Sequence, residues 1–113
     1  RRRVPVGEGG IRHLIDADRI ARMKRGAILV NSARGGVVDE LAVAAALRSG
    51  QLGGAALDVF EREPLAAGSP LADCPNVLLT PHIAGVTVES NLRVSMLVAE
   101  KVAAALRTLQ ARL

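Results

Sequence analysis

Short apolar runs alternate with longer amphipathic stretches along this chain. Three runs, at Ala27–Asn31, Gly54–Asp58 and Val77–Thr80, consist mostly of small and aliphatic residues. Runs of this length and composition are typical of buried parallel strands. Because helical stretches separate the runs, the pattern predicts βαβ units and therefore a parallel sheet.

The ends of the first two predicted helices are marked by residues that cap backbone groups. Asp16 or Asp18 is expected to begin a short helix that runs through Met23, because aspartate accepts hydrogen bonds from the free amides of a first turn. Asp39 is a similar cap for a second helix, and Gly50 is well placed to end that helix.

A long amphipathic helix is predicted over about 88–109, where apolar residues recur at three- and four-residue steps. Together these elements make the C-terminal half of a doubly wound α/β sheet, followed by the long helix. The glycine-rich phosphate turn of the other half is missing, since the nearest sequence, GEGGIR at 7–12, has Arg12 at the place of the third glycine. We interpret that segment as an ordinary loop.

Composition narrows the classes of function. The formal charge of +4 depends largely on Arg1–Arg3, and the other charges mix both signs, as on a solvated surface. No Trp or Tyr offers a stacking platform for nucleic acid. Apolar runs are shorter than the roughly 18 residues of a membrane helix. The single cysteine, Cys74, allows no internal disulfide and suits a reducing compartment. The chain is therefore expected to be cytoplasmic, with no nucleic-acid, membrane or metal partner.

One polar residue that can do chemistry follows each apolar run. These residues are Arg34, Glu63 and His82, and open parallel sheets bind ligands just outside the carboxyl ends of their strands. A guanidinium can bind a carboxylate through two parallel hydrogen bonds. An imidazole can give or take a proton near neutral pH, and a neighbouring carboxylate favours its protonated form and fixes its tautomer. The pattern predicts one site that contains all three side chains.

Each of these residues also has an ordinary interpretation. Arg34 can be a surface arginine beside a Gly-Gly turn, His82 a structural histidine, and Glu63 a solvated loop glutamate. Asp58 can be a turn-forming residue at a strand end, or an acceptor for an amide group of a cofactor. His13 lies among charged residues and is assigned to the surface.

Three segments together carry a resemblance to a known family. They are MKRGAILVNSARGGVVDE at 23–40, LGGAALDVFEREPL at 52–65 and NVLLTPHIAGVT at 76–87. In order and spacing they resemble the D-isomer-specific 2-hydroxyacid dehydrogenases, from about Leu14 to the last helix. The resemblance implies a Rossmann-type fold. Residues 1–87 would be part of an NAD-binding domain, and residues 88–113 a helix that returns toward a substrate domain.

The resemblance also implies roles for individual residues. Arg34 would hold the substrate carboxylate, His82 would be the acid/base, Glu63 its partner, and Asp58 an acceptor for the nicotinamide carboxamide. The implied cofactor is NAD, with NADP not excluded, and the implied substrate is a small D-2-hydroxy or 2-oxo acid. The full-length protein would be a homodimer. The implied cofactor contacts are Val4, Pro5, Ser32, Ala33, Arg34, Asp58, His82, Ala84 and Gly85.

The sequence departs from the family pattern near its start. Arg3 stands where the family has His before Val-Pro, and the loop that follows is one residue longer. Because the phosphate-binding glycines and nearly all of the substrate domain are missing, the isolated chain is expected to be inactive. Two alternatives to an enzyme stay open: a cofactor-sensing, corepressor-like binding module of the same fold, and an inactive truncated product.

Overall fold

A computed structural model describes residues 11–112 of the chain, so the predicted cofactor contacts Val4 and Pro5 lie outside the described residues. The chain forms two compact units, of which the first ends at His82 and the second begins at Ile83. The elements, in chain order, are α1 (Ala17–Ala21), β1 (Ala27–Asn31), α2 (Glu40–Ser49), β2 (Leu52–Leu57), β3 (Val77–Leu79) and α3 (Val88–Gln110).

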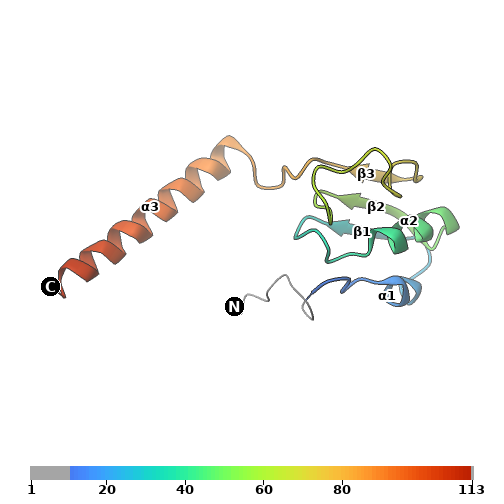
Figure 1. Cartoon of the computed structure of the whole chain (residues 1–113), viewed down its shortest axis with the longest axis horizontal. Helices are drawn as coiled ribbons and strands as arrows, with labels where there is room; N and C mark the ends of the chain where they lie inside the picture. The colour runs from blue at the N-terminus through green and yellow to red at the C-terminus, as the bar shows by residue number, and fades with distance from the viewer. Residues whose placement is uncertain (1–10, 113) are drawn as a thin grey trace. The chain divides into compact units, whose positions relative to one another are not determined.

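The strands form a parallel sheet in the order β1-β2-β3 (Figure 1). This confirms the prediction of half a doubly wound sheet. At the carboxyl ends of the strands, Asn31 pairs with Leu57, and Leu57 pairs with Leu79. The segments that follow the strands therefore leave the sheet along the same edge, as the site prediction requires.

Capping residues fix both helices of the first unit. The side chain of Asp16 accepts a hydrogen bond from the Arg19 amide, so Asp16 rather than Asp18 begins α1. Asp39 accepts from the first-turn amides of α2, and Gly50 ends that helix at a φ of 78°, a left-handed conformation that glycine adopts without strain. The predicted caps of α2 are confirmed. Helix α1 ends earlier than predicted, at Ala21.

The sheet is buried on one face only, which corrects the expectation of buried strands. Side chains on one face of the sheet, such as Leu29, Leu57 and Leu79, belong to the same hydrophobic core as residues of α1 and α2. On the other face the side chains of Ile28, Val30 and Leu78 are 67%, 66% and 62% exposed. A parallel sheet normally has helices on both faces. Among the described residues of the first unit, α2 packs against one face of the sheet and α1 packs against α2. The apolar runs alone did not reveal which face of each strand is covered.

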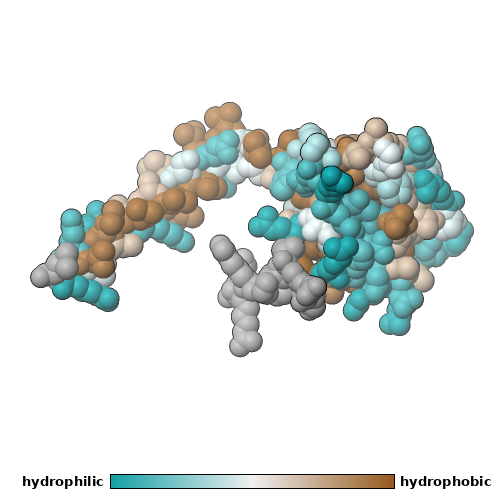
Figure 2. Space-filling view, in the orientation of Figure 1, coloured by the Kyte–Doolittle hydropathy of each residue, from teal (hydrophilic) through white to brown (hydrophobic). Residues whose placement is uncertain are grey.

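The second unit contains α3, which confirms the predicted long helix. The side chain of Thr87 accepts a hydrogen bond from the Ser90 amide and begins the helix. None of the residues of α3 is buried, and apolar side chains run along it (Figure 2). Within 11–112, no helix has both the length and the apolar character needed to cross a membrane. The division into a domain of 1–87 and a helix of 88–113 stays a prediction.

Candidate active site

The functional candidates of the first unit follow the strands that hold them. Arg34 lies on the loop after β1, Asp58 and Glu63 on the segment after β2, and His82 shortly after β3. Since the strands are parallel and in register, these positions all lie at the carboxyl edge of the sheet. The structure therefore brings together segments that are far apart in the sequence.

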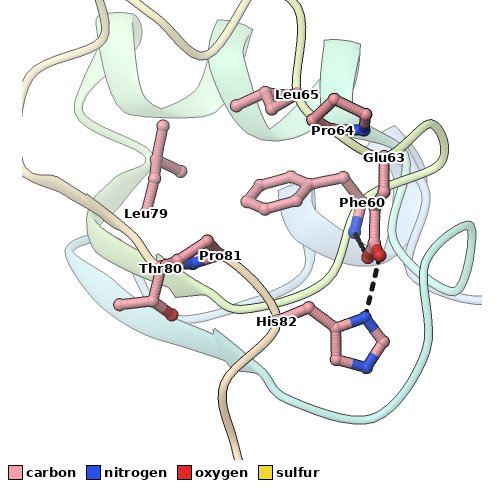
Figure 3. A pocket seen from close by; sticks show the side chains of 8 residues that line it. All are labelled: Phe60, Glu63, Pro64, Leu65, Leu79, Thr80, Pro81 and His82. Carbon is pink, nitrogen blue, oxygen red and sulfur yellow. Dashed lines mark hydrogen bonds and ion pairs between the residues drawn. The ribbon is translucent and has the colours of Figure 1, made fainter.

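His82 and Glu63 form a direct pair. The Nδ1 atom of His82 lies 2.8 Å from Oε2 of Glu63, as the dashed line in Figure 3 marks. The other carboxylate oxygen, Oε1, accepts a hydrogen bond of 3.1 Å from the backbone amide of Phe60. The hydrogen bond with His82 lowers the pKa of Glu63, and the bond from Phe60 acts in the same direction. Glu63 is therefore held as a carboxylate that faces the ring.

The second ring nitrogen of His82 is left open for a ligand. Nε2 points away from Glu63 (Figure 3), and no described residue hydrogen-bonds to it. The His82 backbone has a φ of 53°, a left-handed conformation that non-glycine residues seldom adopt and that is often found at functional sites. With Nδ1 bound to a carboxylate, the ring can exchange a proton through Nε2.

A mostly apolar pocket of about 590 Å³ lies beside this pair. Phe60, Leu65 and Leu79 line it together with both members of the pair (Figure 3). An apolar wall strengthens electrostatic interactions near it, because less water screens them. The pocket gives a small ligand a place next to the imidazole.

The loop after β1 packs closely against the segment after β2. The side chain of Asn31 donates a hydrogen bond to the carbonyl of Arg34, and its oxygen accepts one from the Ala33 amide. A Cβ at Gly35 would lie only 1.8 Å from the carbonyl oxygen of Phe60, so the two backbones touch where only glycine fits. The Arg34 side chain is exposed, and no carboxylate within 11–112 forms an ion pair with it. It is free to bind an anionic ligand.

The other predicted cofactor contacts have different surroundings. Asp58 is 7% exposed at the end of β2, and its carboxylate accepts a 2.7 Å hydrogen bond from the Thr80 hydroxyl. Ser32 and Ala33 are exposed on the loop after β1. Ala84 and Gly85 belong to the second unit, and their role as cofactor contacts stays a prediction.

A second polar cluster, which the sequence interpretation missed, joins the segment before α1 to the loops after β1 and β2. His13 is half-buried rather than a plain surface residue, and its Nε2 lies 2.6 Å from Oε1 of Glu61. Its Nδ1 lies 3.8 Å from Oδ2 of Asp39. These three residues offer metal-ligand atoms within 4.8 Å of one another. The carboxylates face different ring nitrogens, however, which suits a ring held between two acceptors better than one shared ion. No sequence spacing signals this contact, because 48 residues separate His13 from Glu61.

Comparison with known proteins places the three motifs in one family. The family model described as "D-isomer specific 2-hydroxyacid dehydrogenase, NAD binding domain" matches residues 7–84. An (S)-sulfolactate dehydrogenase of Chromohalobacter salexigens is 56% identical over 103 residues, which are 91% of this chain and 33% of that protein. The chain thus spans about a third of the length of this curated relative.

Solved structures agree with the sequence comparison. A glyoxylate reductase from Paecilomyes thermophila matches 84% of this chain and 29% of its own, with a TM-score of 0.77 and 38% identity. A D-isomer specific 2-hydroxyacid dehydrogenase from Xanthobacter autotrophicus Py2, solved in complex with NADPH and MES, matches 72% of this chain and 26% of its own, with a TM-score of 0.65 and 54% identity. The fold of these neighbours is the Rossmann type that the sequence predicted.

Proposed function

Because the chain belongs to the D-isomer specific 2-hydroxyacid dehydrogenase family and carries part of its NAD-binding domain, we propose that it supplies the acid/base pair and the carboxylate anchor of a 2-hydroxyacid dehydrogenase. The reaction is hydride transfer between a nicotinamide cofactor, NAD or NADP, and a D-2-hydroxy or 2-oxo acid. One observation carries the proposal: Glu63 holds Nδ1 of His82 while Nε2 stays open beside a pocket.

Three residues of the chain have different roles in the proposed reaction. The Arg34 guanidinium binds the substrate carboxylate, which directs the C2 oxygen toward the imidazole. In reduction His82 donates the proton at Nε2 to this oxygen as negative charge develops there. Glu63 stabilises the imidazolium before the transfer, and in oxidation His82 takes the proton back. The nicotinamide, when bound, supplies or accepts the hydride.

The residues of the first unit fit the nicotinamide half of such a cofactor. Asp58 follows β2 directly as a nearly buried carboxylate that accepts a hydrogen bond from Thr80. An acceptor there suits a carboxamide NH₂ group. The diphosphate half has no such match, because the 113 residues contain no GxGxxG turn. We therefore infer that the isolated chain binds cofactor weakly and is inactive by itself.

The substrate class follows from the shared chemistry of the relatives. One is named an (S)-sulfolactate dehydrogenase and others are named glyoxylate reductases. These names share a short acid with a hydroxyl or carbonyl at C2. The choice among such acids is made by groups beyond Arg34. The homodimer and the cytoplasmic location stay predictions.

The test is a kinetic comparison in the complete product of the gene that encodes these residues. Glyoxylate, hydroxypyruvate and sulfopyruvate are offered with NADH and NADPH. We expect His82→Asn to lower kcat by about 10²- to 10⁴-fold, the usual contribution of a general acid or base, while NADH affinity changes little. Arg34→Gln should chiefly raise the KM for the acid. The control is Arg62→Gln, an exposed change on the same loop as Glu63. An unchanged kcat in His82→Asn would contradict the proposal.

A further inference from the structure

We propose that His13 is a positioning residue that holds the loop of Arg34 and the loop of Glu63 at a fixed separation. The inference rests on the proposed function of those two residues. It concerns a histidine that takes no part in the chemistry itself. His13 acts through its backbone on one loop and through its side chain on the other.

The backbone of His13 holds the Arg34 loop. Its amide donates a 2.7 Å hydrogen bond to the carbonyl of Gly36, two residues after Arg34. The contact continues along the chain, because the Ile15 amide donates to the Val37 carbonyl, and the Ile15 carbonyl accepts from the Asp39 amide. The segment around His13 therefore runs beside the whole second half of this loop.

The side chain of His13 holds the other loop. Nε2 lies 2.6 Å from Oε1 of Glu61, and the backbone amide of Glu61 donates a 2.6 Å hydrogen bond to Oε1 of Glu40, the first residue of α2. Burial raises the pKa of Glu40, although the bond from Glu61 opposes this shift. Glu61 is thus attached through both its backbone and its side chain, two residues before the carboxylate that faces His82.

The position of Glu61 affects Glu63 because both lie in one short segment that is held by contacts at Phe60. The Phe60 amide donates to Glu63, and the Phe60 carbonyl lies against Gly35 next to Arg34. A shift of Glu61 must therefore move Phe60 or Glu63, and with them the acceptor of Nδ1 of His82. Such sites lose rate when a group shifts by about 1 Å.

The conformation of His13 supports a role beyond surface packing. Its φ is 50°, and His82 has almost the same value, 53°. A left-handed conformation is unfavourable for residues with a side chain and persists only where surrounding contacts impose it. At His13 those contacts are the bond to Gly36 on one side and the bond to Glu61 on the other.

The first test observes the ring of His82 by ¹⁵N NMR in the 113-residue chain. Only two histidines are present, so their ring signals are readily separated. At a pH where the rings are neutral, the acceptor at Nδ1 favours the Nδ1–H tautomer of His82. We expect His13→Ala and Glu61→Ala to lower the Nδ1–H to Nε2–H ratio at least about threefold, the scale of one net hydrogen bond. Glu61→Gln, which keeps an acceptor oxygen, should restore most of the ratio.

The controls separate this proposal from the proposed function. Arg62→Ala should leave the ratio as in the parent chain, and Glu63→Ala should remove the preference altogether. If Glu63→Ala removes it and the changes at His13 and Glu61 do not alter it, the positioning role is wrong and the acid/base pair stands. If Glu63→Ala has no effect, the pair itself is wrong.

A kinetic measurement gives a second readout in the complete gene product. His13→Ala and Glu61→Ala should each lower kcat about tenfold and leave the KM for NADH within about twofold. The double variant should lose no more than either single one, because both remove the same contact. Additive losses, or a change confined to the KM for NADH, would overturn the proposal.

Discussion

At the scale of single residues, the Glu63 carboxylate links stability to pH. Its pKa is lowered from 4.5 in the folded chain by its hydrogen bond with His82. A lowered folded-state pKa adds stability above about pH 4.5, and this stability is lost as the pH falls through the folded value. We therefore expect Glu63→Gln to lower the melting temperature at pH 7 and to lower it less near pH 3. The control is Asp73→Asn, a change at an exposed acidic residue on the segment before β3. An equal loss at both pH values would contradict the prediction.

Gly35 is a second residue whose role can be measured. Its missing side chain lets the Arg34 loop touch the Phe60 carbonyl, and a Cβ would lie 1.8 Å from that oxygen. We expect Gly35→Ala to lower the free energy of unfolding by about 1–3 kcal/mol, the usual cost of overpacking. Gly68→Ala is the matched control, because a Cβ there meets nothing within 4 Å. Urea denaturation compares the two variants, and equal stabilities would show that the loops do not touch.

The candidate residues could be chosen from the sequence because each follows an apolar run. Glu63 and His82 meet as that reasoning predicted, since parallel strands in register deliver their loops to one edge. The contact of His13 with Glu61 could not be found in this way. His13 precedes the first predicted strand, so its contact with Glu61 depends on how two segments distant in the sequence pack in space.

At the scale of elements, the caps were predictable and the covered faces of the sheet were not. Asp39 begins α2 and Gly50 ends it as expected, because a cap acts on backbone groups a few residues away. Burial of a strand face depends instead on which helices pack against it. The row formed by Ile28, Val30 and Leu78 is as apolar as the buried row and yet is exposed.

This difference between the two faces of the sheet predicts unequal effects of mutation. In the 113-residue chain, Leu57→Ala should lower the free energy of unfolding by about 2–5 kcal/mol, because Leu57 is 2% exposed in the core. Val30→Thr should cost no more than about 0.5 kcal/mol, as surface changes do, since it lies 66% exposed on the open face. Chemical denaturation measures both. A large loss in Val30→Thr would mean that the open face is covered in solution.

At the scale of the whole molecule, the candidate site residues lie close together while much apolar surface stays exposed. The segments that follow β1, β2 and β3 place Arg34, Glu63 and His82 along one edge of the sheet. Apolar surface remains on the open sheet face and along α3, none of whose residues is buried (Figure 2). The curated relative in the sulfolactate dehydrogenase class is about three times as long as the matched region, which is 33% of it. This chain can therefore contain the residues proposed for proton transfer and still bind the cofactor weakly.

Weak binding of the cofactor by the isolated chain is the last prediction. The diphosphate of a dinucleotide normally rests on a glycine-rich turn and a helix N-terminus, and the 113 residues contain no GxGxxG turn. The cofactor contacts that we propose at Asp58 and on the loop after β1 concern only the nicotinamide end. We therefore expect calorimetric titration of the chain with NADH or NADPH to give a Kd weaker than about 1 mM, a binding free energy no stronger than about −4 kcal/mol. The Xanthobacter protein that was solved with NADPH serves as the positive control. A micromolar Kd for the chain would mean that its own residues bind the diphosphate without a GxGxxG turn.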